Sequence, residues 1–215
     1  MLLRLSPHHF APRVCFPFAA RSFRIMPSNN MEAANASGLT PNETKSLKER
    51  SADPHEEKIL KAVKELYSCK PSEETYSIYA SNAVFHDPIG IAEGITAIRA
   101  QFNGLVKVFP RADVTQFRVL ENPPSVPTST ILVDQDVSYF RNPSGSPTKT
   151  VNSLLTLETN DAHQVTRHTE EWDHKRETTR EDGFFGMLNE QRKKLTASVT
   201  GLFVSQDPPE GKTSK

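Results

Sequence analysis

The sequence predicts an α+β fold in which helices cover one antiparallel sheet. Apolar residues recur at helical spacing between residues 53 and 110, and the pattern then changes to the two-residue alternation of strands up to residue 174. Short turn-forming segments separate the alternating runs, and such close connections favour an antiparallel meander. The chain of 215 residues is long enough for one well-filled domain with tails.

Residues 27–52 contain almost no bulky apolar side chains, and we expect the whole segment 1–52 to be disordered. The first 31 residues of the chain contain four arginines and no acid, as is typical of a mitochondrial transit peptide. We therefore expect a mitochondrial location. The alternative is an upstream extension with Met26 or Met31 as the working start, which would leave the protein cytoplasmic.

Helices are predicted before the sheet begins. Asp53, Pro54 and Glu56 form a helix start, because a capping residue, a first-turn proline and a third-position carboxylate follow one another. A short second helix follows Pro71. The "AVF" stretch is a short strand that "HDPIG" ends, and a third helix then continues to Pro110.

Four strands and a last helix make up the remainder. A C-terminal helix is expected within residues 177–204, and residues 205–215 are expected to form a flexible tail. The strands are expected at Val114–Leu120, Thr130–Phe140, Lys149–Glu158 and His163–His174.

Composition and charge exclude several classes of protein. No stretch approaches the roughly 20 apolar residues that a membrane span needs. Without the four N-terminal arginines the chain has 22 basic and 26 acidic residues, a net charge of −4. The rest of the chain therefore lacks the excess of basic residues that is typical of a nucleic-acid-binding protein. The only cysteines are Cys15 and Cys69, so we expect no cysteine zinc cluster.

Two segments resemble a known family. "YASNAVFHDPIGIAEGITAIRAQFNGLVKVFP" is similar to the signature of SnoaL-like domains in the nuclear transport factor 2-like superfamily, and "VTRHTEEWD" resembles the last strand of that fold. The resemblance covers residues 55–175 and assigns the domain to residues 53–176. It implies a cone: a curved antiparallel sheet around a pocket, packed with the N-terminal helices. The superfamily includes ketosteroid isomerase, scytalone dehydratase, polyketide cyclases and non-catalytic binders, so the fold alone does not settle function.

The last strand supplies the candidate catalytic residues, His168 and Glu170. Trp172 is the sole tryptophan and belongs on the enclosed face, which places His168 and Glu170 inside with it. Two positions along a strand span about 7 Å, so both side chains could contact one small ligand. Burial would also perturb their pKa values. The opposite register would leave Glu170 and Glu171 in a solvated rim.

Other residues are expected to bind the ligand. Asp87 should turn inward after Phe85, although its position before Pro88 also suits a carboxylate that accepts backbone N–H groups in a turn. The apolar face of the expected strand Thr130–Phe140 carries the polar groups Gln135 and Tyr139, whereas Asp134 and Asp136 lie on its other face and should be solvated. The candidate ligand-binding residues are Phe85, Asp87, Phe102, Gln135, Tyr139 and Trp172.

No metal or cofactor is expected. His168 and His174 lie about 20 Å apart along an extended strand, too far to bind one ion together. We therefore expect a protein that binds a small apolar, polyketide- or steroid-like molecule, with isomerase, cyclase or dehydratase chemistry as its possible activity. The alternative is a non-catalytic protein-interaction or dimerisation module, and a homodimer is expected in either case. Whether the protein is an enzyme stays open.

Overall fold

A computed structural model describes residues 32–177, 183–184, 186–190 and 193. The expected transit peptide and the expected flexible tail lie outside the described residues, as does most of the segment 177–204. The described residues of that segment from 183 onward are helical.

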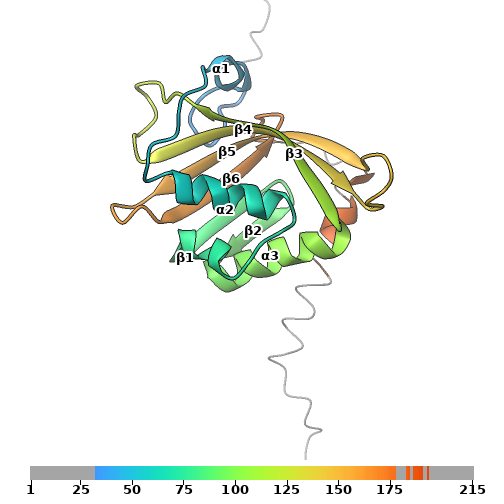
Figure 1. Cartoon of the computed structure of the whole chain (residues 1–215). Helices are drawn as coiled ribbons and strands as arrows, with labels where there is room; N and C mark the ends of the chain where they lie inside the picture. The colour runs from blue at the N-terminus through green and yellow to red at the C-terminus, as the bar shows by residue number, and fades with distance from the viewer. Residues whose placement is uncertain (1–31, 178–182, 185, 191–192, 194–215) are drawn as a thin grey trace, which may run out of the picture. The chain divides into compact units, whose positions relative to one another are not determined.

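One six-stranded sheet organises the described residues, with the strand order β2-β1-β6-β5-β4-β3 (Figure 1). Every neighbouring pair is antiparallel except β1 and β6, which run parallel. The strands are β1 (Tyr79–Asp87), β2 (Gly90–Glu93), β3 (Arg111–Leu120), β4 (Thr130–Phe140), β5 (Lys149–Thr159) and β6 (Val165–Trp172).

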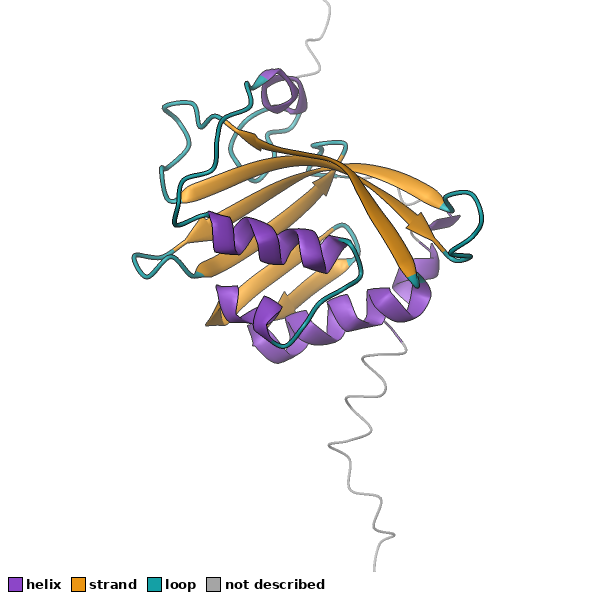
Figure 2. Cartoon of the chain, in the orientation of Figure 1, coloured by secondary structure: helices purple, strands orange, loops and turns teal. Residues whose placement is uncertain are grey.

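The helices lie on both sides of this curved sheet (Figure 2). Helices α2 (Glu57–Tyr67) and α3 (Gly94–Val108) lie on its concave side, with the 3-10 helix η1 (Glu74–Ile78) between them in the chain. Helix α1 (Pro41–Ser46) lies beyond the convex side. The α+β fold with a curved, mostly antiparallel sheet is therefore confirmed.

Strand alternation divides the buried side chains between two cores. On β4, Ile131, Val133 and Val137 join the large core beneath α2 and α3. Leu132 faces the other way and packs with Leu154 in a smaller core on the convex side. The sheet thus has two buried faces, and neighbouring residues of one strand enter different environments.

Several boundaries differ from the sequence prediction. Strand β1 extends well beyond the "AVF" stretch, β3 begins at Arg111 rather than Val114, and β6 excludes both His163 and His174. The "HDPIG" stretch is a hairpin turn, because Oδ1 of Asp87 accepts hydrogen bonds from the backbone N–H groups of Ile89 and Gly90, and the chain returns as the unpredicted edge strand β2. Helix α2 begins at Glu57 rather than near Asp53. The Glu56 carboxylate accepts from the backbone N–H of Asp53, as expected of a helix start, but helical geometry begins only after it.

The prediction that residues up to 52 are disordered is wrong from residue 32 onward. Thr40 and Glu43 form a capping box at the start of α1. Leu39 and Leu47 pack on the smaller core. The segment has few apolar side chains, but hydrogen bonds to the sheet fix it as well, including one from the Arg50 backbone N–H to the Val119 carbonyl. Composition alone does not reveal such long-range partners.

The prediction that Asp134 is solvated is also wrong. Its side chain is 5% exposed and accepts hydrogen bonds from Nε2 of His174 at 3.1 Å, from Arg118 at 3.1 Å and from Asn152 at 3.0 Å. Nδ1 of His174 lies 2.8 Å from the Thr44 hydroxyl. The segment that carries α1 therefore covers a buried polar cluster on the convex face. Asp136, beside it, is half-buried.

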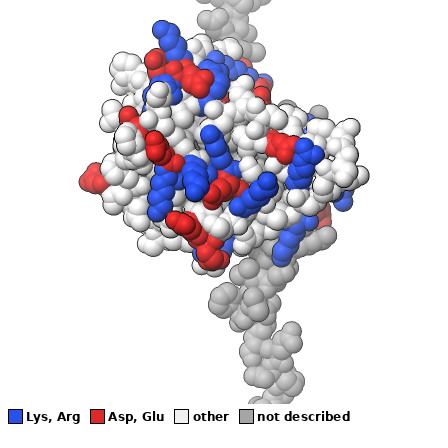
Figure 3. Space-filling view, viewed as in Figure 1, with Lys and Arg blue, Asp and Glu red and all other residues white. Residues whose placement is uncertain are grey.

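The described surface carries both signs of charge. On the face shown in Figure 3, Lys and Arg side chains are interspersed with Asp and Glu rather than gathered in one basic stripe. Among the described residues, no helix is both long enough and apolar enough to cross a bilayer.

Candidate functional site

The concave side of the sheet encloses a cavity of about 450 Å³. Its walls come from the end of α2, from β1, β2 and α3, from the inward faces of β4 and β6, and from two residues of the C-terminal helix, Phe184 and Leu188. Ile91 and Glu93 on β2 line the cavity and are both exposed, so the cavity opens to solvent beside this edge strand. Most of the lining is apolar, as in small-molecule sites generally.

Glu170 is the carboxylate at the centre of the wall. It is 8% exposed, and its Oε2 accepts a hydrogen bond from the Tyr67 hydroxyl at 3.0 Å while Oε1 accepts one from Nε1 of Trp172 at 3.1 Å. Burial, with the nearby Asp87 charge, raises the pKa of Glu170 to about 7, although the hydrogen bonds from Tyr67, Ser153 and Trp172 oppose the rise. Among the described residues, no cation pairs with it.

His168 lies behind the wall rather than in it. It is fully buried between the rings of Phe85 and Phe102, and it is not one of the residues that line the cavity. Nδ1 lies 2.8 Å from the Tyr79 hydroxyl and Nε2 lies 3.3 Å from the Tyr67 hydroxyl. Burial lowers the pKa of His168 to about 3, so the ring is neutral. The expectation that His168 and Glu170 contact one ligand together is not met by this placement.

Tyr67 is the functional candidate that the sequence reading missed. It lies at the end of α2, lines the cavity and joins His168 to Glu170 through its hydroxyl. In the sequence it belongs to the apolar face of a helix and looks like an ordinary core residue. Only the packing of α2 against β6 brings its hydroxyl to the carboxylate.

Asp87 combines the two roles that the sequence left open. It lines the cavity, while Oδ1 caps the hairpin turn and Oδ2 accepts a hydrogen bond from Nε2 of Gln101 at 2.7 Å. Gln101 comes from α3 and lines the cavity as well. Asp87 therefore ties the turn to the helix at the cavity wall. His86, its neighbour, is exposed.

The two polar candidates of β4 have different positions. Tyr139 lines the cavity and is 5% exposed, and its hydroxyl has no hydrogen-bond partner among the described residues. Gln135 is fully buried and does not line the cavity. Its Nε2 donates to Oγ of Ser153, which in turn hydrogen-bonds to Glu170. Gln135 thus reaches the site only through Ser153.

Aromatic rings form much of the remaining wall. The candidate ligand-binding residues Phe85, Phe102 and Trp172 line the cavity. Phe184 packs on the rings of Phe109, Tyr139 and Trp172, with centroid distances of 5.6, 5.7 and 5.8 Å. This contact shows that the described part of the C-terminal helix packs on the cone of its own chain.

The charge of the lining restricts the ligand. The described lining residues include three carboxylates, Asp87, Glu93 and Glu170, and no Lys, Arg or His. An anion would enter this wall without a compensating charge, at a large cost in desolvation. The lining suits neutral or cationic molecules.

The element order and the curved sheet over α2 and α3 agree with the cone that the SnoaL-like resemblance implies. No model of a known protein family and no curated protein matches the sequence.

Several solved structures are similar to this chain at low sequence identity. A nuclear transport factor 2-like protein from Anabaena variabilis has a TM-score of 0.47 at 10% identity, over 57% of this chain and 93% of its own. A steroid delta-isomerase from Pseudomonas aeruginosa has a TM-score of 0.46 at 13% identity, over 70% and 99%. A de novo designed protein with a curved β-sheet has a TM-score of 0.44 at 15% identity, over 64% and 97%.

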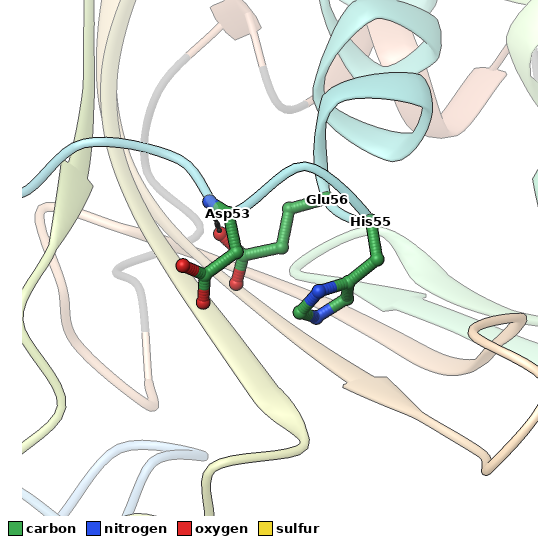
Figure 4. A group of neighbouring side chains, drawn as sticks. All are labelled: Asp53, His55 and Glu56. Atoms are coloured by element: carbon green, nitrogen blue, oxygen red, sulfur yellow. Dashed lines mark hydrogen bonds between the residues drawn. The ribbon is translucent and has the colours of Figure 1, made fainter.

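One cluster of metal-ligating side chains occurs outside the cavity. Figure 4 shows Asp53, His55 and Glu56 just before α2, with potential ligand atoms within 4.8 Å of one another. Both Glu56 oxygens already accept hydrogen bonds from Arg50, each at 2.7 Å. An ion would have to displace this bidentate pair, so the cluster is better described as an anchor for α2 than as a metal site.

Proposed function

We propose that the protein binds a small, mainly apolar molecule in the cone cavity and exchanges a proton with it through Glu170. The observation that carries this proposal is an open cavity whose wall holds one buried carboxylate with neutral hydrogen-bond donors. The volume of about 450 Å³ lies in the range of roughly 300–1,000 Å³ found for small-molecule sites. Such a volume would suit a polyketide- or steroid-like compound.

The proton affinity of Glu170 suits a general base. A pKa of about 7 means that both protonation forms are populated near neutral pH. Glu170 can take a proton from a carbon beside a carbonyl group and return it to another carbon, which is an isomerisation. Cyclisation and dehydration can begin with the same abstraction.

Tyr139 is the group best suited to receive the developing negative charge. Its hydroxyl lies in the cavity wall without a partner among the described residues, so it is available to donate to a carbonyl oxygen of the ligand. A preorganised donor at such an oxygen stabilises an enolate more than the neutral carbonyl. Base and donor would then act on the same ligand from different strands.

The open cavity supports ligand binding over the alternative of an interaction module. An interaction module that binds no ligand would be expected to fill its interior with its own aromatic side chains. The aromatic rings instead line a space that reaches Glu170.

The test combines ligand retention with proton exchange. Native mass spectrometry of the purified full-length protein should detect a retained small molecule. Neutral ketones of steroid size should then exchange their α-hydrogens with D₂O in the presence of the protein, followed by NMR. Glu170→Gln should still bind the ketone but slow the exchange by about 10²–10⁴-fold, because the base is lost while the shape is kept.

Glu93→Gln is the matched control, because Glu93 lines the cavity at its exposed edge. It should leave the exchange unchanged. Equal loss in both variants would mean that the overall charge of the cavity matters and Glu170 does not act as a base. Failure of every ketone to bind, with no molecule retained, would contradict the binding proposal itself.

We also propose that residues 1–31 direct the protein to mitochondria. The support is their four arginines and lack of acids. A fusion of this segment to a fluorescent protein should enter mitochondria, and a diffuse signal would contradict the proposal.

A further inference from the structure

Behind the cavity wall, His168 connects two tyrosines in a chain of hydrogen bonds that ends on Glu170. The Tyr79 hydroxyl lies 2.8 Å from Nδ1 of His168, and Nε2 lies 3.3 Å from the Tyr67 hydroxyl. That hydroxyl lies 3.0 Å from Oε2 of Glu170. His168 itself is buried and away from the lining, so it acts on a ligand only through other residues.

The number of protons on each group sets the direction of this chain. The Tyr67 hydroxyl has one proton and donates it to the Glu170 carboxylate, so its oxygen must accept from His168. Nε2 of His168 therefore carries the proton, and Nδ1 accepts from the Tyr79 hydroxyl. A neutral imidazole provides one donor and one acceptor, as this assignment requires.

We propose that His168 is a positioning residue, which donates to Tyr67 and thereby holds the tyrosine hydroxyl on the ionised form of Glu170. The inference deepens the proposed function, because it concerns the residue that exchanges the proton there. A donor that is itself hydrogen-bonded is polarised and donates more strongly, so the effect of His168 passes through Tyr67 to the carboxylate.

Several groups besides Tyr67 face Glu170. The experiment must distinguish their effects on the pKa of Glu170 from the effect of Tyr67. Ser153 and Trp172 donate to the carboxylate, whereas the Asp87 charge raises its pKa. Tyr139, from β4, also interacts electrostatically with Glu170. If His168 only fills space between Phe85 and Phe102, replacing it should not change the pKa of Glu170 in a way that depends on Tyr67.

The experiment measures the pKa of Glu170 by carboxyl ¹³C NMR titration of the full-length protein, with Glu170→Gln to assign the signal. Tyr67→Phe should raise this pKa by about 1–2 units, because a hydrogen bond to the charged form is lost. His168→Leu should raise it by about half a unit. His168→Gln should restore most of the difference, because its amide N–H can donate to Tyr67.

The double variant Tyr67→Phe/His168→Leu decides whether His168 acts through Tyr67. We expect its pKa to equal that of Tyr67→Phe alone, because the hydroxyl that transmits the effect is already missing. Additive shifts would show that His168 acts on Glu170 directly, and no shift in His168→Leu would show that it is only a space-filling residue. Either result overturns the proposal.

Tyr79→Phe keeps the proposal testable if His168→Leu does not fold. It removes the donor to Nδ1 without altering Tyr67 or Glu170, and it should raise the pKa of Glu170 by a few tenths of a unit. Tyr76→Phe, which removes a hydroxyl bonded to Asn103, is the matched control and should leave that pKa unchanged. Equal shifts in both variants would contradict the proposal. If the pKa of Glu170 does not depend on His168 through Tyr67 but the protein binds its ligand, only this inference is overturned. If that dependence is found but no ligand binds, only the proposed function is overturned.

Discussion

Glu170 and Glu171 are neighbours on β6, but their carboxylates lie on opposite faces of the sheet. Glu170 lines the open cavity and is held by the side-chain donors Tyr67, Ser153 and Trp172. Glu171 is 5% exposed and accepts two hydrogen bonds from the backbone N–H of Ala36, at 3.0 and 2.8 Å, beneath the segment that carries α1. Burial raises the pKa of both, yet only one of them can meet a ligand.

The convex face extends this contrast. Asp134 is also buried there, and burial acts to raise its pKa, but the hydrogen bonds from His174 and Asn152 and the charge of Arg118 outweigh that effect and lower it. Its charge is therefore compensated by the protein itself. The comparison shows that Asp134 on the closed face has cationic and neutral partners that lower its pKa, whereas Glu170 on the open face has neutral donors that do not offset its burial.

The largest expected effect is on the closed face. Asp134→Ala should destabilise the protein by about 3–5 kcal/mol, because His174 and Arg118 lose a buried acceptor. Urea unfolding followed by circular dichroism measures this loss. Asp136→Ala is the control, since Asp136 is half-buried and should cost much less. Equal losses of stability in the two variants would mean that the buried hydrogen bonds of Asp134 contribute no more than the half-buried Asp136 does.

The open face should show a pH dependence of stability instead. The folded protein binds the Glu170 proton more tightly than the unfolded chain, whose pKa is near 4.5. As the pH rises from about 4.5 to about 7 the unfolded chain releases its proton first, so on the order of 3 kcal/mol of stability is lost in that window. Glu170→Gln should remove this loss in unfolding titrations across the same range. An unchanged slope in the variant would contradict the assignment of the shift to Glu170.

Glu171→Gln should have a smaller effect, and on stability only. The Ala36 backbone N–H would then donate to a neutral amide oxygen in place of a carboxylate, at a cost of about 1–2 kcal/mol. A solvent-exposed Glu171 would tolerate the substitution, but Glu171 is buried. Ligand binding should not change. A variant that lost ligand but kept its stability would reverse the roles of the two glutamates.

The smallest effect concerns the start of α1. Thr40→Ala removes a capping box and should cost about 1 kcal/mol of stability. Hydrogen exchange should rise in residues 36–47 while the amides of α3 beside the cavity keep their protection. Matched loss of protection in α3 would show that the two faces are coupled rather than independent.

The sequence predicted the framework of the cone well, because that framework depends on local periodicity. The four long strands and the helices around residues 57–67 and 94–108 appear where alternation and helical spacing placed them. The inward position of Glu170 and Trp172 also followed from alternation, once one aromatic residue fixed the register. Short β2 has too few residues to produce a pattern.

The sequence by itself determined which residue types alternate along each strand, and therefore which ones share a face. It did not determine what covers each face, because that depends on contacts between residues more than 100 positions apart. Tyr67 reaches Glu170, and Ala36 reaches Glu171, only when α2 and the segment before α1 pack against β6. The tertiary structure therefore decided that Tyr67 lines the cavity, that His168 lies behind its wall and that Glu171 lies on the other face of the sheet. The long-range hydrogen bonds and the cover over each face arise from that packing, and the local sequence contains no signal for them.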